Sequence, residues 1–186
     1  MAELIYASVI SLDGYIADRN GNFDWGTPDE EVHEFFNDLT RGIGTHLMGR
    51  RMYEVMVAWE TPETFVGDSA VMADYANIWQ AADKVVYSRT LDSVSSAKTR
   101  LEREFDAAAI RELKAGAAAD ISIGGPALAA HAIRAGLVDC FQFVVAPVIV
   151  GGGNPAFPTD VRVDLELVNE RRFAGGMFFV SYRTRR

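Results

Sequence analysis

A short apolar run at residues 121–123 ends in two glycines and a proline, and an alanine-rich segment follows at once. Proline suits the first position of a helix, so the sequence predicts a helix that begins at Pro126 with Gly125 as its cap. Because glycine has no side chain, Gly124 and Gly125 would let another group approach the backbone closely. This junction therefore makes either a tight turn or a place for a ligand.

The predicted helix start has the properties of an anion site. The amides of Ala127 and Leu128 have no carbonyl partner inside the helix. Together with the positive end of the helix dipole, they attract a phosphate or a carboxylate. A well-capped turn without a ligand is the alternative explanation of the same residues.

Two other junctions carry residues suited to phosphate oxygens. Gly49 separates an apolar run from a helical segment, and Arg50 and Arg51 follow it directly. Ser88 and Arg89 come at the end of another apolar run. Guanidinium groups bind phosphate through a planar fork of donors. An arginine pair on a solvated helix face is the alternative.

These junctions require strands and helices to alternate along the chain. Apolar runs predict strands at 4–10, 45–48, 83–87, 121–123 and 140–150. The segment VDLELVNERRFAGGMFFVSYRT, 163–184, alternates about a Gly-Gly turn and predicts an antiparallel hairpin. The predicted fold class is α/β, a single domain over residues 1–186 with three layers: a mostly parallel central sheet, helices on both faces and the C-terminal antiparallel hairpin.

In such a sheet, the carboxyl ends of the parallel strands lie along one edge, where ligands bind. We therefore expect the three junctions to meet there, in an arrangement that suits an extended anionic ligand better than an isolated phosphate. The run GGGNPA at 151–156 has the spacing of a dinucleotide fingerprint. Pro155 and Pro158 argue against the helix that this fingerprint requires, so we expect a glycine-rich loop or turn instead.

One helix has clear signals at its start. In TPDEEVHEFFNDL, Thr27 is the expected cap, Pro28 the first helical residue and Glu30 the partner in a capping box. An apolar stripe follows at spacings of three, four and seven residues, and His33 lies at its edge. A further helix is expected over residues 101–118 with its end near Gly116, whereas residues 58–82 show weak periodicity.

Composition limits the classes of function. With 186 residues, 49% hydrophobic and 24% charged, the chain has the composition of an ordinary soluble domain. A net charge of −8 argues against nucleic-acid binding, and no run approaches the ~18 apolar residues of a membrane span. Cys140 is the single cysteine, so we expect a buried, inert thiol and a cytoplasmic protein without a signal peptide. The three scattered histidines have no metal-ligand spacing.

Four motifs together resemble a known family. SLDGYIA, LMGRRMYE, ISIGGPALA and APVIVGGGNPAF occur in this order over nearly the whole chain. The sequence resembles the dihydrofolate reductase superfamily, in the branch of the C-terminal reductase domain of bacterial riboflavin biosynthesis. The resemblance implies the dihydrofolate reductase-like fold, NADPH as the reductant and a homodimer.

The resemblance also implies a cofactor site in four parts: a phosphate-binding turn after residue 48, a strand end beside the adenosine 2′-phosphate, a helix start under the pyrophosphate, and two apolar positions flanking the nicotinamide. The matching residues are Val9, Ile16, Gly49, Arg50, Arg51, Ser88, Arg89, Gly124, Gly125, Pro126, Ala127 and Leu128. In this family the Gly-Gly pair often has a cis peptide bond.

The implied activity is hydride transfer from NADPH to a small heterocyclic or carbonyl substrate, and reduction of 5-amino-6-(5-phosphoribosylamino)uracil is its narrower form. A proton must also reach the substrate, and the candidates are Asp13, Asp24 and His33. The alternative is a turn residue for Asp13, a residue ahead of the helix cap for Asp24 and a surface position for His33. A nucleotide-binding scaffold or sensor without turnover is the rival function. The apolar strand at 141–150 and the C-terminal hairpin are the expected dimer interface.

Overall fold

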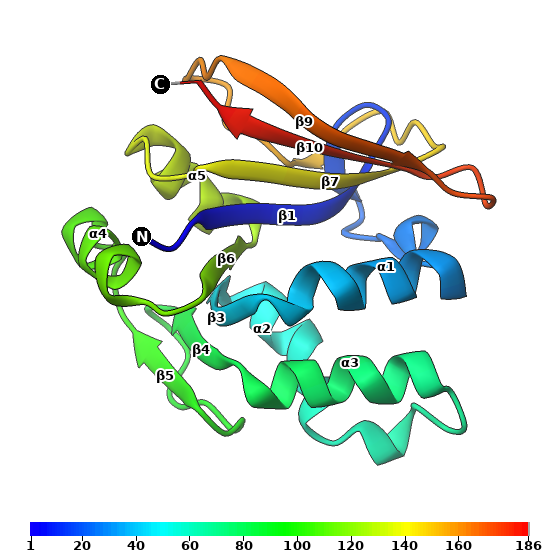
Figure 1. The fold of residues 1–186 in the computed structure, drawn as a ribbon, viewed down its shortest axis with the longest axis horizontal. Helices are drawn as coiled ribbons and strands as arrows, with labels where there is room; N and C mark the ends of the chain where they lie inside the picture. Colours follow the sequence, from blue (N-terminus) through cyan, green and yellow to red (C-terminus); the bar gives the residue numbers. More distant parts are fainter. Residues whose placement is uncertain (186) are drawn as a thin grey trace.

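The computed structural model describes residues 1–185, which gather around an eight-stranded sheet (Figure 1). The strand order across the sheet is β5-β4-β3-β6-β1-β7-β10-β9. In chain order these strands are β1 (Leu4–Ser11), β3 (Ile43–Gly49), β4 (Asp83–Tyr87), β5 (Thr99–Glu102), β6 (Asp120–Gly124), β7 (Cys140–Ala146), β9 (Leu165–Arg172) and β10 (Phe178–Thr184).

The six strands from β5 to β7 run parallel to one another. Only β10 runs antiparallel to β7, and β9 pairs with β10 to complete the C-terminal hairpin. The predicted parallel sheet with an antiparallel edge is therefore confirmed. A small second sheet joins β2 (Tyr15–Asp18) to β8 (Gly153–Pro155), so GGGNPA contributes a short strand and no helix.

Successive side chains of each strand point to opposite faces of the sheet, and helices pack on both faces. Leu47 and Val85 point into a core shared with α4 (Ala107–Gly116) and α5 (Pro126–Arg134). Met48 and Val86 point to the other face, where α2 (Arg50–Met56) and α3 (Ala70–Ala81) pack, and α1 (Glu30–Arg41) covers the neighbouring strands. Helices therefore cover both faces of the sheet, which confirms the three-layer architecture. The central strands are mostly apolar because they are buried on both faces.

Helix α1 begins later than its sequence signals indicated. Its cap is Asp29, whose Oδ1 accepts a hydrogen bond from the amide of Val32 at 2.9 Å, and the preceding residues form the 3-10 turn η1 (Asp24–Gly26). The prediction of Thr27 as cap with a capping box to Glu30 is therefore wrong. Aspartate is as good a cap as threonine, and here it stands directly before the helical residues.

Two other segments also differ from expectation. The strand β5 occupies the start of the segment predicted as one helix, and α4 then begins after its cap Asp106. The weakly periodic segment contains α3 and two 3-10 turns, η2 (Val57–Glu60) and η3 (Pro62–Thr64). Helix α3 lies beside α1 and is capped by Ser69 (Figure 1). No helix of the described chain is long and apolar enough to cross a membrane.

Candidate functional site

The three candidate junctions meet at one edge of the sheet, as predicted. β4, β3 and β6 are adjacent parallel strands, so their carboxyl ends lie together. Gly49 is in register with Tyr87, and Met48 with Gly124. A side chain added at Gly125 would lie 3.6 Å from the amide nitrogen of Gly49, which shows how closely the two turns approach.

The start of α5 leaves its first amides free. Gly125 is the N-cap, as predicted, and no side chain caps the helix. The carbonyl of Gly125 accepts the amide of Ala129 at 2.9 Å, whereas the amides of Ala127 and Leu128 have no hydrogen-bond partner within residues 1–185. Free amides at a helix start are the feature that the predicted anion site requires.

The two glycines of this turn also have structural reasons. A Cβ at Gly124 would overlap Sδ of Met52 and lie 2.5 Å from its Cε. Gly125 has φ of +87°, a conformation that side chains disfavour, although a Cβ there would make only ordinary contacts. Their peptide bond is trans, and none within residues 1–185 is cis, so the cis bond suggested by the resemblance is not found.

The three arginines differ in the hydrogen bonds and ion pairs that they make. Arg50 donates to Oε1 of Glu54 at 2.7 Å and to the hydroxyl of Thr90 at 2.8 Å, which places its guanidinium between α2 and the end of β4. Arg51 is exposed and has no ion pair or hydrogen bond within residues 1–185, so all its donors are available. Arg89 makes only an exposed contact with Glu104 at 3.3 Å.

Ser88 is buried at the end of β4, and its hydroxyl oxygen accepts the amides of Thr90 and Leu91 at 3.3 and 3.0 Å. These bonds shape the turn and leave the hydroxyl proton to donate. On β1, Val9 lies against η1, since a Cβ at Gly26 would be 3.1 Å from its Cγ1. Ile16 is half-buried on β2, against the opposite core.

Asp13 joins two loops beside the end of β1. Its carboxylate accepts the hydroxyl of Ser11 at 2.7 Å and the amides of Val150 and Gly151 at 3.1 and 2.8 Å. These hydrogen bonds, with that of Ser11 the largest, lower the pKa of Asp13 below its usual value. A carboxylate held ionised in this way is suited to fastening the loops, and it has no proton to give at neutral pH.

The other two proton-donor candidates have different surroundings. Asp24 is exposed in η1, and its carboxylate accepts only the amide of Trp25, at 3.1 Å. His33 is half-buried between helices, with Nδ1 3.2 Å from Oδ1 of Asn37 and its ring edge-on to Trp59 and Tyr75. His33 is therefore held in one orientation, whereas Asp24 is not.

Several residues of the site were missed from sequence alone. Glu54 and Asn37 lie four residues after Arg50 and His33, a helical spacing that could have identified both pairs. No such signal marks Thr90 or Met52, because their contacts depend on how separate strands and helices meet.

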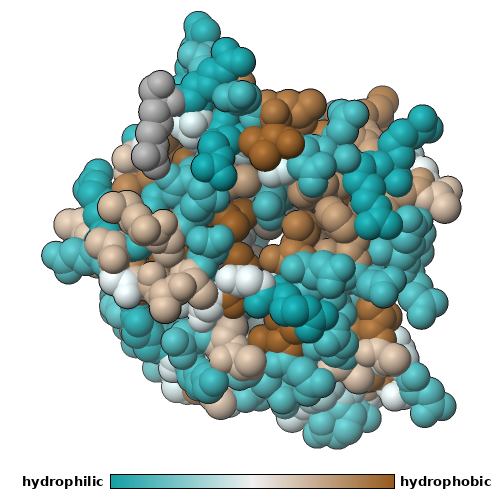
Figure 2. Space-filling view, viewed as in Figure 1, coloured by the Kyte–Doolittle hydropathy of each residue, from teal (hydrophilic) through white to brown (hydrophobic). Residues whose placement is uncertain are grey.

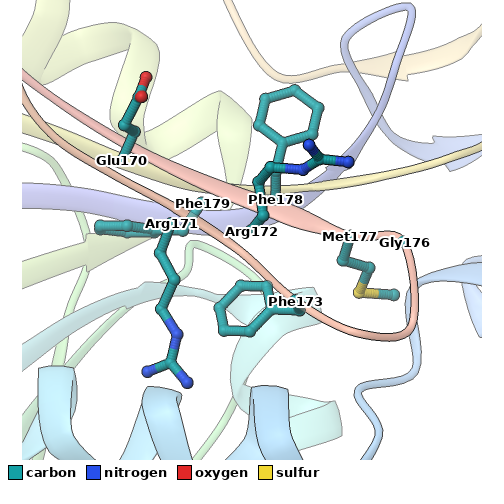
Figure 3. A pocket seen from close by; sticks show the side chains of 8 residues that line it. All are labelled: Glu170, Arg171, Arg172, Phe173, Gly176, Met177, Phe178 and Phe179. Carbon is teal, nitrogen blue, oxygen red and sulfur yellow. The ribbon is translucent and has the colours of Figure 1, made fainter.

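A hollow of about 390 Å³ lies at the C-terminal hairpin, and Val9 packs in the same apolar cluster as Phe173 and Phe179 of its lining. Figure 3 shows that its lining comes from both sides of the hairpin, with Arg172 and Phe178 projecting one way and Arg171 the other. Arg171 is already bound to Glu31 at 3.0 Å. None of the three strand-end junctions lines this hollow, so we place the candidate site at the strand ends. No group of potential metal ligands is found in the described chain.

Comparison with known proteins identifies chains of similar sequence and fold. A protein of Bacillus subtilis (strain 168), Uncharacterized protein YyaP, is 29% identical over 189 residues, which cover 96% of this chain and 93% of that protein. The crystal structure of a putative riboflavin biosynthesis protein from Shewanella sp. PV-4 matches all of both chains with a TM-score of 0.77 at 23% identity.

The fold is also that of dihydrofolate reductase. The enzyme from Enterococcus faecalis, solved in complex with NADP(H) and RAB-propyl, matches with a TM-score of 0.65 at 16% identity over 98% of this chain and 96% of that one. The family model of the RibD C-terminal domain matches residues 2–179. The chain therefore belongs to the RibD C-terminal domain family.

Proposed function

We propose that the protein is an NADPH-dependent reductase of a small heterocyclic or carbonyl compound. The meeting of three glycine- and arginine-bearing strand ends at one edge of the sheet is the observation that carries this proposal. Family membership supports a reductase, and the fold is shared with an enzyme solved with NADP(H). The reduced cofactor supplies a hydride when it is bound.

The residues present fit a long anionic cofactor. The free amides of Ala127 and Leu128 suit its pyrophosphate, and Gly125 adopts the φ of +87° that the turn before them requires. Arg51, in the first turn of α2, offers a guanidinium that makes no hydrogen bond within residues 1–185. Gly49, Arg50 and Pro126 complete the phosphate-facing backbone in this proposal.

The two ends of the cofactor have separate places in the proposed site. Ser88 and Arg89 lie at the end of β4, where a hydroxyl and a guanidinium can select a 2′-phosphate. Val9 lies on β1 beside η1 and offers an apolar wall to the nicotinamide, with Ile16 on β2 as the second. Van der Waals contact of this kind fixes orientation, which hydride transfer requires.

The proton is proposed to come from His33, or from water held near Asp24. Asp13 is assigned to fastening the loops, because the hydrogen bonds that lower its pKa keep it ionised. The substrate is proposed to be a heterocycle with a reducible C=N or C=O bond, and 5-amino-6-(5-phosphoribosylamino)uracil is the first compound to test.

Calorimetry and turnover together test the function. We expect NADPH to bind with 1:1 stoichiometry and more tightly than NADH, and Arg89→Ala to reduce that preference several-fold. NADPH oxidation should then be measured with the uracil compound and with dihydrofolate. Absence of any NADPH binding would refute the proposal. Binding without turnover of any small carbonyl or imine compound would favour the rival function of a nucleotide-binding sensor.

A homodimer remains a prediction. Within the expected interface segment 141–150, β7 is buried between β1 and β10, whereas the residues after it reach the surface, with Ile149 70% exposed. β9 is the edge strand and exposes Leu167 and Val168, and apolar surface is visible in this upper region (Figure 2). Sedimentation of the wild type and of Leu167→Lys tests the predicted homodimer. The cytoplasmic location also stays a prediction.

A further inference from the structure

A chain of polar side chains ties α1 to α3 and ends at His33. The helices lie side by side (Figure 1). Arg41 donates two hydrogen bonds to the carboxylate of Asp74, at 2.9 and 3.2 Å. Asn37 donates from Nδ2 to the same carboxylate at 2.8 Å, and its Oδ1 lies 3.2 Å from Nδ1 of His33.

The orientation of the Asn37 amide follows from its partners. Its Nδ2 contacts both the carbonyl oxygen of Val71 and Oδ2 of Asp74, each at 2.8 Å. Hydrogen bonds from Arg41 and Asn37 lower the pKa of Asp74, so neither partner has a hydrogen to donate. Exchanging the amide oxygen and nitrogen would set three acceptors against one another, at a site where Asn37 is 1% exposed.

The proton position on His33 follows in turn. Since Nδ2 faces Val71 and Asp74, the atom that faces His33 is Oδ1, a carbonyl oxygen that can only accept. Nδ1 of His33 must therefore carry a hydrogen to donate to it. A neutral imidazole carries one hydrogen, which leaves the lone pair on Nε2. Nε2 has no hydrogen-bond partner within residues 1–185 and is not among the buried polar atoms, so it is open to solvent.

We propose that Asn37 is a positioning residue that holds His33 in the Nδ1–H tautomer, so that Nε2 is the single atom through which His33 passes a proton to the substrate. This inference rests on the proposed reductase function. The protonated ring gives its Nε2 hydrogen to the nitrogen or oxygen of the C=N or C=O bond, whose carbon receives the hydride. The ring is left neutral with its hydrogen on Nδ1, and solvent protonates it again.

Rigid packing supports this role. The ring of His33 contacts Trp59 with an interplanar angle of 68° and Tyr75 with an angle of 89°, so aromatic edges limit its rotation. A proton donor must be held within hydrogen-bond reach of its target, and orientation by a second residue is the usual means. A purely structural tie between α1 and α3 is the competing explanation for the same hydrogen bonds.

Two substitutions separate these explanations. Asn37→Ala removes the acceptor, so the neutral ring is free to move its hydrogen to Nε2. Asn37→Asp keeps an acceptor for Nδ1–H, but it loses both donated hydrogen bonds and sets a second carboxylate against Asp74. If the hydrogen bonds only tie the helices together, Asn37→Asp should lower kcat more than Asn37→Ala does. If Asn37 positions His33, Asn37→Ala should lower kcat more.

The test combines the imidazole nitrogen-15 NMR spectrum with kcat for the uracil compound. We expect the neutral His33 ring of the wild type and of Asn37→Asp to carry its hydrogen on Nδ1, and Asn37→Ala to shift hydrogen to Nε2. We expect kcat to fall about tenfold in Asn37→Ala with unchanged KM for NADPH, and to stay within about threefold of wild type in Asn37→Asp. Glu34→Gln, on the exposed side of α1, is the matched control.

An Nε2–H ring in the wild-type spectrum overturns the inference, whether or not the variants fold. A larger loss of kcat in Asn37→Asp than in Asn37→Ala also overturns it, in favour of the structural tie. Wild-type protein that binds no NADPH refutes the proposed function and the catalytic part of the inference. The spectrum still decides the tautomer in that case.

Discussion

The paired glycines at the start of α5 should respond differently to alanine substitution. Gly124→Ala introduces a Cβ into the space of the Met52 thioether, with Cε only 2.5 Å away. Overpacking costs about 1–3 kcal/mol, and because Sδ and Cε are the end of a flexible side chain that can rotate away, we expect a cost near the lower limit, about 1 kcal/mol. Gly125→Ala meets no such obstacle, but it forces alanine to adopt φ of +87°, a strain that also costs about 1–3 kcal/mol.

Shortening Met52 distinguishes the two causes. Met52→Ala removes Sδ and Cε, so we expect it to recover most of the cost of Gly124→Ala, a coupling energy of about 1 kcal/mol in a double-mutant cycle. The nearest Met52 atom to a Cβ at 125 is its own Cβ, at 3.9 Å, which alanine retains. The cycle between 125 and 52 should therefore be additive within about 0.5 kcal/mol.

Urea denaturation of the six proteins, at constant m-value, measures these free energies of unfolding. For a chain of this size each kcal/mol also lowers Tm by about 2–4 °C, which gives an independent check. Additive behaviour between 124 and 52 would refute the packing explanation of Gly124. Unchanged stability in Gly125→Ala would refute the strained conformation of Gly125.

Three further predictions concern charged and titratable groups. Burial, with the nearby Lys84 charge, lowers the pKa of His46 to about 4. The folded protein should therefore lose roughly 3 kcal/mol of unfolding free energy as the pH falls from about 6.5 to about 4, and His46→Gln should remove this pH dependence. The same pH dependence of unfolding in the variant would contradict this prediction. Because the pKa of Asp13 is lowered, the stability that its ionised carboxylate contributes is present above about pH 4 and is lost only as the pH falls through the lowered value. At pH 7, Asp13→Asn should therefore speed hydrogen exchange at the amides of Val150 and Gly151. Unaltered exchange would show that the carboxylate does not fasten this loop. Lys114→Met should destabilise the fold by about 1–3 kcal/mol in denaturant unfolding, because it removes the buried ammonium group that binds the carboxylate of Asp139 and the carbonyl of Leu137. A loss under about 0.5 kcal/mol would refute that.

The sheet was predictable because its strands are apolar and short and are separated by glycine or charged turns. Parallel strands at 4–10, 83–87 and 121–123 could be placed, since only buried strands leave such runs. β5 could not be placed in this way. Its residues Thr99–Glu102 alternate weakly and lie at the sheet edge, where little apolar burial is needed.

The site was predictable in its backbone but less so in its side chains. Glycine and proline mark the cap at Gly125 by local conformation alone, so the turn was placed correctly. Met52 fills the space beside Gly124, and this contact depends on how α2 packs against the sheet, which spacing along the chain does not encode. The contact between His33 and Asn37, four residues apart on α1, could have been predicted from their spacing. The start of α1 was misplaced because Thr27, Pro28 and Asp29 all suit a helix start.

A crystal structure of the protein with NADPH tests the proposed site most directly. We expect the pyrophosphate within about 3 Å of the amide nitrogens of Ala127 and Leu128, in hydrogen-bond range, with the 2′-phosphate beside Ser88 and Arg89. A cofactor seated in the hairpin hollow, or a pyrophosphate that leaves the start of α5 untouched, would contradict the assignment of these strand ends to a dinucleotide.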